Sequence, residues 1–325
     1  MLELAADLLP LLDARTPVAA VTVTRVVRSA PRGVGATLAV TRGARVIGSI
    51  SGGCVENDAV MLGLDALRTG SVRRARFGFT DDGTVTPIAA GLACGGAVDV
   101  VAYRVEEAAR PALEAARDGR ATTLRLELDG EALVLERTAA ARLIILGAGE
   151  HAAALCRLGA AAGFAVTVCD EWALLATPER FPEAREVVVA TPHEYLASLA
   201  DPDERTAVCV LTHDERLDVP ALRVALRSAA GFVGAMGARA TVARRAALLR
   251  AAGVTDAELS RLHSPLGLDL GGASAEETAL SVIAEIVASR NDADARPLRE
   301  RGGTRLHAVV GPRPAEAGSC AVRSA

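Results

Sequence analysis

The apolar residues of the first hundred positions change repeatedly between helical and strand spacing. Helical stripes occur over about residues 2–14 and 55–68. Between and after them lie short runs rich in β-branched residues, bounded by Gly, Pro, Asp and Ser, which predict strands. These strands are residues 18–27, 37–40, 45–50, 73–79 and 97–105. The pattern predicts an α+β domain over residues 1–105.

Residues 106–141 are predicted to form a connector. A helical pattern at about residues 107–117 precedes two strand patterns, 122–128 and 132–136, which Asp129-Gly130 joins. Asp-Gly between alternating apolar residues is a strong hairpin signal, because both positions tolerate the positive φ of a tight turn. We therefore expect a helix followed by a β-hairpin.

From Arg142 onward the pattern becomes a regular alternation of buried strands and helices. A strand followed by a helix, repeated several times, indicates a parallel, doubly wound sheet of the Rossmann type. The first helix of this series is predicted over residues 150–162. The predicted strands are residues 143–146, 165–169, 186–190, 207–211 and 231–233.

A long helix at residues 275–289 closes this second domain. Ser274 and Glu277 form the capping-box pattern at its start. We expect the second domain to span residues 142–292 and a mobile tail to follow over 293–325. The predicted fold class is therefore α/β, with an N-terminal α+β domain followed by a Rossmann-like doubly wound parallel-sheet domain.

The composition excludes several classes of function. All 36 basic residues of the 325-residue chain are arginine, and lysine is missing. A P-loop lysine and a lysine Schiff base are therefore impossible, which rules out most kinases, P-loop ATPases and pyridoxal enzymes. A net charge of −4 without a basic stripe gives no electrostatic footprint for nucleic acid.

The sequence pattern also bears on the compartment. The first fifteen residues lack the basic start and the small-residue cleavage site of a signal peptide. No run of about 18 apolar residues is present to insert into a membrane. The six cysteines are scattered without disulfide-rich spacing, which favours reduced thiols. We therefore expect a cytoplasmic protein.

A dinucleotide-binding fingerprint lies between the first strand and the first helix of the second domain. In Gly147-Ala-Gly149-Glu-His-Ala152, the first glycine allows a tight turn and the second lets the backbone approach a pyrophosphate. Asp170 ends the next strand, where an acidic residue binds a ribose hydroxyl. The alternative is a glycine turn that serves only helix–strand packing. Glu150, in the first helical turn, would repel a bound phosphate.

Two further strand ends are candidates for ligand contacts. His213 follows the fourth strand and could face the crevice in which such sheets bind ligands; a loop histidine without a ligand explains it at least as well. Gly234-Ala-Met-Gly237 is a second glycine-rich turn. Its backbone together with Arg239 could take an anion, although packing alone also explains the glycines. No acid–base constellation accompanies these turns, so we identify no catalytic residue.

Two cysteines of the first domain lie in glycine loops. Ser51-Gly52-Gly53-Cys54 precedes a helix, whose dipole favours a thiolate, and its glycines are expected to leave backbone N–H groups open to a bulky anion. A thiolate there suits soft metals or sulfur chemistry. Cys94-Gly95-Gly96 is a second such loop. Both cysteines could instead be small buried residues in tight turns, and their spacing does not make a structural zinc site.

Together these motifs resemble the xanthine dehydrogenase accessory factors, the XdhC/CoxI family. The resemblance covers nearly the whole chain to about residue 290, and the motifs follow the order of that family. The matching segments are Gly48-Ser-Ile-Ser-Gly-Gly-Cys-Val-Glu56, Cys94-Gly-Gly-Ala-Val-Asp99, Gly147-Ala-Gly149, Leu211-Thr-His-Asp214, Phe232-Val-Gly-Ala-Met-Gly-Ala-Arg239, His263-Ser-Pro-Leu-Gly-Leu-Asp-Leu-Gly271 and Glu276-Glu-Thr-Ala-Leu-Ser-Val-Ile-Ala-Glu285.

The resemblance implies a maturation factor for molybdenum hydroxylases such as xanthine or carbon monoxide dehydrogenase. Such a factor is understood to hold the molybdenum cofactor, as molybdopterin or its dinucleotide form. It protects the sulfurated cofactor and delivers it to the apo-hydroxylase, and it is expected to meet a cysteine desulfurase. The resemblance thus implies an accessory protein in place of an enzyme, and a homodimer would suit such a carrier.

By this resemblance, Cys54 with Gly52 and Gly53 is the leading cofactor contact, and Cys54 is the thiolate that would face molybdenum. Arg32 and Arg239, each beside a glycine-containing loop, are the first basic residues to consider for a phosphate tail. The full set of candidate cofactor-binding residues is Ser51, Gly52, Gly53, Cys54, Glu56, Cys94, Gly95, Gly96, Gly147, Gly149, Asp170, His213 and Arg239.

The chain departs from the family pattern at two positions. Trp172 stands two residues after Asp170, where the family tends to have arginine; an indole can stack on a base but cannot pair with phosphate. Ala238 replaces the serine of the Gly-Ser-Arg turn and removes a hydroxyl contact. Two other functions stay open. One is an NAD(P)-dependent oxidoreductase that uses the Gly147 fingerprint, and the other is a scaffold that binds no small molecule.

Overall fold

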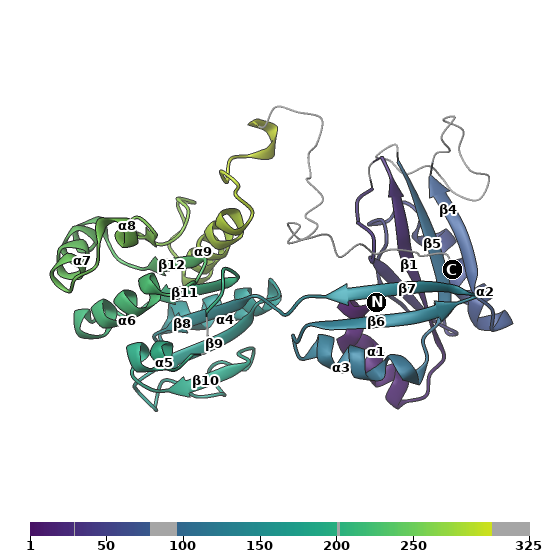
Figure 1. Ribbon diagram of the computed structural model, residues 1–325, viewed down its shortest axis with the longest axis horizontal. Helices are drawn as coiled ribbons and strands as arrows, with labels where there is room; N and C mark the ends of the chain where they lie inside the picture. The colour runs from purple at the N-terminus through teal and green to yellow at the C-terminus, as the bar shows by residue number, and fades with distance from the viewer. Residues whose placement is uncertain (29, 79–95, 200–201, 301–325) are drawn as a thin grey trace. The chain divides into compact units, whose positions relative to one another are not determined.

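The structure is a computed structural model that describes residues 1–28, 30–78, 96–199 and 202–300 (Figure 1). The chain divides between Ala139 and Ala140 into two compact units. Each unit has its own sheet and its own hydrophobic core. Within the described ranges, every helix is too short or too polar to span a bilayer.

The first unit is built on a five-stranded antiparallel sheet with the strand order β3-β2-β1-β5-β4. The first six residues of the central strand β1 are buried, because side chains pack on both faces of the sheet there. Double coverage explains why this part of the strand is an almost unbroken apolar run. The strands are β1 (Val18–Val27), β2 (Thr37–Thr41), β3 (Val46–Gly48), β4 (Arg73–Gly78) and β5 (Ala97–Arg104).

Two different sets of elements cover the faces of this sheet. On one face, α2 packs against alternate residues of β1 and β5 such as Val21 and Val100. On the other face, α1, α3 and the β6–β7 hairpin share a core with Val101 and Tyr103. The elements are η1 (Leu2–Leu4), α1 (Ala5–Asp13), α2 (Glu56–Thr69), η2 (Glu107–Ala109), α3 (Arg110–Arg117), β6 (Thr122–Leu128) and β7 (Glu131–Arg137).

The second unit contains a six-stranded parallel sheet with the strand order β10-β9-β8-β11-β12-β13. The order reverses between β8 and β11, and doubly wound sheets bind ligands at the carboxyl ends of the strands at such a reversal. The strands are β8 (Arg142–Leu146), β9 (Ala165–Asp170), β10 (Glu186–Val189), β11 (Thr206–Val210), β12 (Phe232–Ala235) and β13 (Leu262–His263).

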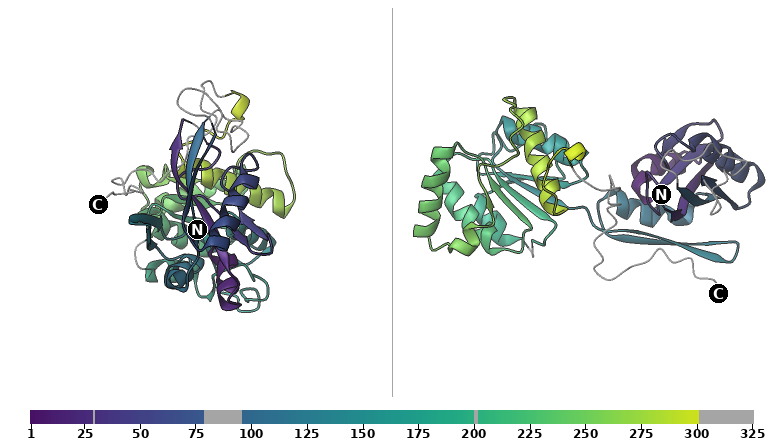
Figure 2. Two further views of the ribbon diagram at one scale, coloured as in Figure 1. Left: turned by 90° about the vertical axis from the view of Figure 1, so that its right-hand side faces the viewer. Right: turned by 90° about the horizontal axis from the view of Figure 1, so that it is seen from above.

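Helices lie on both faces of this parallel sheet (Figure 2). In β8, Leu143 and Ile145 join the core under α4 and α9, whereas Ile144 and Leu146 join the core under α5, α6 and α7. Burial on both faces explains the continuous apolar run of this strand. The helices are α4 (Glu150–Ala161), α5 (Pro192–Ser198), α6 (Glu215–Arg227), α7 (Arg239–Ala251), α8 (Asp256–Leu259), α9 (Ala275–Arg290) and η3 (Leu298–Glu300).

The predicted fold class is confirmed, since an antiparallel α+β unit precedes a Rossmann-like parallel sheet. The hairpin at Asp129-Gly130 and the capping box of Ser274 and Glu277 are also confirmed. The sequence pattern missed β13, because a strand of two residues is too short to show a period. The predicted domain boundaries and the mobile tail stay predictions, and residues 301–325 lie outside the described chain.

Candidate functional site

A tight loop over residues 49–55 joins β3 to α2 in the first unit and contains Cys54. Gly52 and Gly53 have φ values of +78° and +124°, which residues with a side chain rarely adopt. A Cβ atom added at either glycine would meet no atom within 4 Å, so the space beside them is open. Cys54 is partly exposed and packs against the cluster that contains Val55. The loop thus combines a partly exposed thiol with open space beside two glycines.

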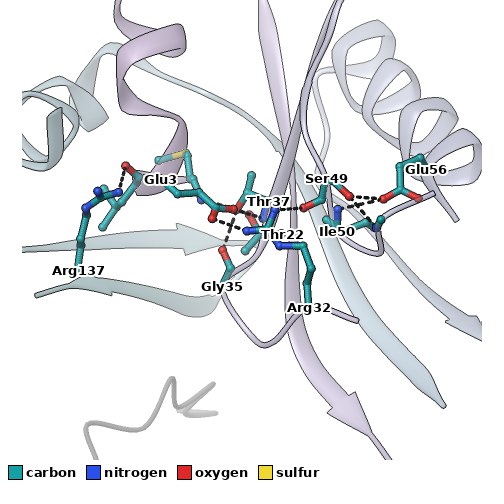
Figure 3. A network of polar contacts seen from close by, with 12 residues as sticks. Glu3, Thr22, Arg32, Gly35, Thr37, Ser49, Ile50, Glu56 and Arg137 are labelled. Carbon is teal, nitrogen blue, oxygen red and sulfur yellow. Dashed lines mark hydrogen bonds and ion pairs between the residues drawn. The ribbon is translucent and has the colours of Figure 1, made fainter. Parts of the chain in front are cut away.

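The carboxylate of Glu56 turns back from the first position of α2 into this loop (Figure 3). It accepts from the N–H groups of Ser51 at 2.8 Å, Gly53 at 2.7 Å and Val55 at 3.2 Å. The hydroxyls of Ser49 and Ser51 also donate to it, that of Ser49 at 2.6 Å. Burial raises the pKa of Glu56, but these hydrogen bonds outweigh it and lower the pKa from 4.5 to about 2. Glu56 is therefore ionised at neutral pH and held within the loop.

The remaining N–H groups of the loop have acceptors of their own. Ser49 Oγ accepts from Gly52 at 2.8 Å, Ser51 Oγ accepts from Cys54 at 3.0 Å, and Ile50 donates to Glu56 at 3.3 Å. Every N–H from Ile50 to Val55 thus donates inside the loop. The expectation that these N–H groups are open to an anionic ligand is therefore wrong. The carboxylate of Glu56 already occupies the position that such an anion would take.

Cys54 is the one partly exposed cysteine in the described part of the chain. Cys156, Cys169 and Cys209 are buried. Burial raises the pKa of Cys156 to about 11 and that of Cys169 to about 12, and it also raises the pKa of Cys209. Among these four thiols, Cys54 is the one that a ligand or a reagent from solution can reach.

Arg32 ties the loop to the segment before α1. Its guanidinium donates to the backbone carbonyl of Ser49 at 3.0 Å and pairs with Glu3 at 2.6 Å. Glu3 in turn accepts from the N–H of Thr37 on β2 at 3.1 Å (Figure 3). Arg32 is therefore already engaged by two groups of its own unit, so its contact with a phosphate tail stays a prediction that these bonds do not favour.

The fingerprint loop of the second unit is organised by the strand next to it. Gly147 has a φ of +109°, and a Cβ atom there would lie 3.0 Å from Thr212 Cγ2, so only glycine fits beside the end of β11. Asp170, which is 7% exposed, accepts from the N–H of Ala148 at 2.7 Å and from that of Trp172 at 2.9 Å. Each carboxylate oxygen of Asp170 therefore already accepts one hydrogen bond. A ribose hydroxyl would have to donate to an oxygen that also accepts from a backbone N–H group.

The N-terminus of α4 differs from that of α2, because it has no side-chain cap. Gly149 is exposed, and a Cβ atom added there would meet no atom within 4 Å. Glu150 occupies the first helical position, yet its side chain is exposed and accepts none of the N–H groups of this turn in the described structure. The first N–H groups of α4 are therefore available to an acceptor from outside.

A buried ion pair ties together the loops that follow β11, β12 and β13. Asp218 of α6 and Arg245 of α7 are 3.1 Å apart, with 3% and 4% of their side chains exposed. Arg245 also donates to the carbonyl of Met236 at 2.7 Å and to Ser264 Oγ at 3.1 Å, and the Thr212 hydroxyl donates to Asp218. Burial raises the pKa of Asp218, whereas the Thr212 hydrogen bond and the charge of Arg245 oppose that rise.

The sequence pattern did not identify this pair, although it contains one signal of it. Asp218 is the first residue of the buried stripe of α6, which continues with Ala221 and Leu222 at helical spacing. A charged residue in such a stripe requires a buried partner. The partner could not be identified, because Arg245 lies on another helix, 27 positions along the chain.

The structure groups the predicted site residues by unit. Ser51, Gly52, Gly53, Cys54 and Glu56 share the loop before α2, whereas Gly147, Gly149 and Asp170 meet at the start of α4. His213 is exposed in the loop beside Gly147. Gly96 is buried directly before β5, whereas Cys94 and Gly95 lie outside the described residues. Arg239 begins α7, but its side chain is not among the described parts of the chain.

Possible metal ligands do not cluster in the described ranges. No three His, Cys, Asp or Glu side chains converge there in a way that could hold a metal ion.

Two family descriptions match this chain, and solved structures resemble it. The family described as the XdhC Rossmann domain matches residues 143–286, and the XdhC and CoxI family matches residues 11–78. A structure named as a xanthine dehydrogenase from Bacillus halodurans is 21% identical, with a TM-score of 0.72. The match covers 90% of this chain and 97% of that one, which shows a shared fold.

Three relatives are similar in sequence. The Escherichia coli protein YqeB is 27% identical over 248 residues, which cover 76% of this chain but only 39% of that relative. A probable xanthine dehydrogenase subunit of Bacillus subtilis is 27% identical over 315 residues, 83% of this chain and 92% of the relative. The molybdenum cofactor insertion chaperone PaoD of E. coli is 26% identical over 289 residues, 83% of this chain and 82% of PaoD.

Proposed function

The chain belongs to the XdhC and CoxI family, and from this membership we propose that it is an accessory protein in the maturation of xanthine dehydrogenase-type molybdenum hydroxylases. In this proposal the molybdenum cofactor is cargo, which the protein holds in its sulfurated form, protects and delivers. The protein itself is not a catalyst. Its partners are the apo-hydroxylase and a cysteine desulfurase that supplies sulfur, and the carrier works as a homodimer.

The observation that carries this proposal is the loop of residues 49–55. Its partly exposed thiol, Cys54, stands next to open space at Gly52 and Gly53. A thiolate is a suitable contact for a soft metal such as molybdenum, which the cofactor brings already bound to sulfur. The phosphate of the cofactor does not suit this loop, because every N–H from Ile50 to Val55 is already used. The residues present thus fit the metal end of the cofactor and not its anionic tail.

A nucleotide is the second ligand of the proposal, bound by the parallel-sheet unit. The uncapped N–H groups at the start of α4 would donate to a phosphate, and Gly149 leaves room for one. Trp172 lies two residues after Asp170 and is 61% exposed, so its indole is available to stack on a base. The nucleotide would be either NAD(P) or the nucleotide part of the dinucleotide form of the cofactor.

The cofactor part of the proposal is tested with Cys54→Ser and Cys54→Ala. Each variant is co-expressed with a xanthine dehydrogenase-type hydroxylase in a molybdenum-replete host. We expect both variants to fold but to lose most of the pterin and molybdenum that co-purify with the wild type, and the hydroxylase to lose activity. Met61→Ala, at an exposed position of α2, is the control that should change neither quantity. Full cofactor retention by both Cys54 variants would remove this residue from the proposal.

The nucleotide part is tested by fluorescence, because Trp172 is the only tryptophan of the chain. Purified protein is titrated with NAD(H), NADP(H) and free nucleoside diphosphates. Saturable quenching of Trp172 by any of them supports the nucleotide site and identifies its preferred base. Saturation by NAD(P)H together with its oxidation would favour the oxidoreductase alternative. If no ligand changed the fluorescence saturably, the nucleotide site would be excluded, and the proposal would be reduced to a carrier of molybdopterin without a nucleotide.

A further inference from the structure

We propose that Glu56 is a positioning residue whose carboxylate acts as a permanent internal anion of the loop at residues 49–55. It fills the N-terminus of α2 so that no outside phosphate binds there, and it fixes the backbone from which Cys54 projects. The inference rests on the proposed function only in naming the cofactor as the molecule that Cys54 meets. The arrangement of the loop itself can be tested without any cofactor.

Several donors converge on one carboxylate. Four N–H groups and two hydroxyls donate to Glu56, from residues 49 to 55. Glycine loops at helix N-termini bind a phosphate through a comparable set of N–H groups. In this loop the side chain of the first helical residue takes the place of the ligand. The loop therefore has the form of an anion site that its own chain has filled.

A short path of hydrogen bonds leads from Glu56 to Cys54. The hydroxyl of Ser51 donates to Glu56, and the same oxygen accepts from the N–H of Cys54 at 3.0 Å. Gly53, directly before Cys54, donates to Glu56 at 2.7 Å. The residues on both sides of Cys54 are thus bonded to one carboxylate, since Val55 also donates to it. Loss of the carboxylate should release the backbone at Cys54 without removing any contact of the thiol itself.

Arg32 holds the loop from the other side. Ser49 donates its hydroxyl to Glu56 and accepts at its carbonyl from Arg32, which Glu3 holds in place (Figure 3). The loop is therefore clamped between a carboxylate at its end and a guanidinium at its start. Because the negative charge of Glu56 is already present at the α2 N-terminus, a second anion there would be repelled. A ligand that approaches Cys54 must then present a part other than its phosphate.

The test measures the alkylation rate of Cys54 in the full chain without cofactor, with iodoacetamide and site assignment by mass spectrometry. In Glu56→Ala, we expect Cys54 to react about tenfold faster than in the wild type, the factor that corresponds to the loss of one or two net hydrogen bonds. Added formate should occupy the vacated position and slow the reaction again, whereas equal chloride should not. Glu150→Ala, which removes the glutamate at the same position of α4, should leave the rate at the wild-type value.

Glu56→Gln keeps the size of the side chain and guards against a failure of Glu56→Ala to fold. Its amide offers one acceptor oxygen in place of two, so Cys54 should again react faster than in the wild type, and formate should have no effect because the space is filled. The proposal is overturned if either folded variant alkylates at the wild-type rate, or if formate leaves Glu56→Ala unchanged. Cofactor loss in the Cys54 variants tests the proposed function separately, so the two can fail independently.

Discussion

Two glycine loops of this chain lead from a strand into a helix whose first residue is glutamate, yet the two glutamates behave in opposite ways. The side chain of Glu56 folds back over its loop and accepts hydrogen bonds from N–H groups of that loop. The N-terminus of α2 is therefore capped by its own first residue. Glu150 is exposed, and the start of α4 has no side-chain cap. The N–H groups of the cysteine loop are thus already bonded, whereas the start of α4 in the fingerprint loop has no side-chain cap.

The residues around each glutamate explain this difference. In the first loop, Ser49 and Ser51 donate to the carboxylate, and the positive φ values of the two glycines curl the chain around it. In the second loop, Asp170 from the neighbouring strand already accepts from Ala148 at 2.7 Å, so a carboxylate other than Glu150 occupies the inside of the turn. What a helix N-terminus can bind is therefore decided by residues outside its own first turn.

The two regions also differ in what holds them. The bonds around Glu56 are partly exposed to water, which can replace a lost partner. The loops after β11, β12 and β13 depend on Asp218 and Arg245, which water hardly reaches. A buried charge that loses its partner is far more costly than an exposed one. Substitutions should therefore damage the two regions to very different extents.

The largest effect is expected from Asp218→Ala, because it leaves Arg245 charged and buried without a counter-ion. We expect it to lower the free energy of unfolding of the second unit by about 3–5 kcal/mol. Urea unfolding followed by Trp172 fluorescence measures this, since the only tryptophan lies in that unit. The alkylation rate of Cys54, in the first unit, should not change.

Arg244→Ala is the matched control, because Arg244 is the neighbour of Arg245 on α7 and pairs with Glu215 at the surface, with 71% of its side chain exposed. This variant should lower the free energy of unfolding of the second unit by no more than about 1 kcal/mol. If both variants destabilised the second unit equally, the pair of Asp218 and Arg245 would not be what holds these loops.

A smaller contrast is expected between Glu56→Ala and Glu150→Ala. Glu56→Ala removes the acceptor of several N–H groups and should lower the free energy of unfolding of the first unit by about 1–3 kcal/mol. Glu150→Ala should stay within about 0.5 kcal/mol of the wild type, because its side chain is exposed. Urea unfolding followed by circular dichroism compares the two. Equal losses would contradict the difference between the loops.

The next contrast concerns ligands. Glu150→Gln removes a negative charge from the open N-terminus of α4 and should tighten the binding of a nucleotide phosphate about two- to fivefold, since one such charge contributes about 0.3–1 kcal/mol. Glu56→Gln should not change that affinity, because its loop lies in the other unit. Titration of Trp172 fluorescence measures both. If only Glu56→Gln raised the nucleotide affinity, the nucleotide would bind at the cysteine loop, which would contradict a site at the start of α4.

The last contrast concerns the dependence of stability on pH. The folded protein holds the pKa of Glu56 at about 2, below its ordinary 4.5, so the stability that this carboxylate contributes is complete above about pH 5 and is lost as the pH falls toward 2. The stability difference between wild type and Glu56→Gln should therefore shrink over that range. Urea unfolding at several acidic pH values measures it. A difference that stays constant down to pH 2 would contradict the lowered pKa.

Local patterns were sufficient for most elements of the fold. The β-branched run of β1, the Asp129-Gly130 turn and the capping box at Ser274 depend on residues within a few positions of one another, and the structure has all three. β13 was missed because it owes its pairing to the neighbouring strand β12 and not to its own pattern. The fingerprint was predictable for the same reason as the elements, since Gly147 and Gly149 mark one strand-to-helix turn.

The chemistry of the two loops was less predictable than their positions. The sequence located Cys54 beside two glycines, but it suggested open N–H groups there and an unfavourable glutamate at Glu150. The structure has the N–H groups of the cysteine loop taken by Glu56 and leaves those of α4 uncapped. Both loops contain glycines followed by glutamate, and the local difference lies in Ser49 and Ser51, whose hydroxyls donate to Glu56 in the first loop alone.

The sequence by itself determined the two kinds of sheet, the order of their elements and the two strand-to-helix turns that contain the candidate residues, because periodicity and turn chemistry act over short distances along the chain. Only the tertiary structure decided which N–H groups stay free and which charges are buried. Several of those outcomes depend on partners far apart in sequence, such as Asp170 for Ala148, Arg32 for Ser49 and Arg245 for Asp218. A hydrogen bond or an ion pair needs its two groups within a few ångströms, and the fold alone brings them there.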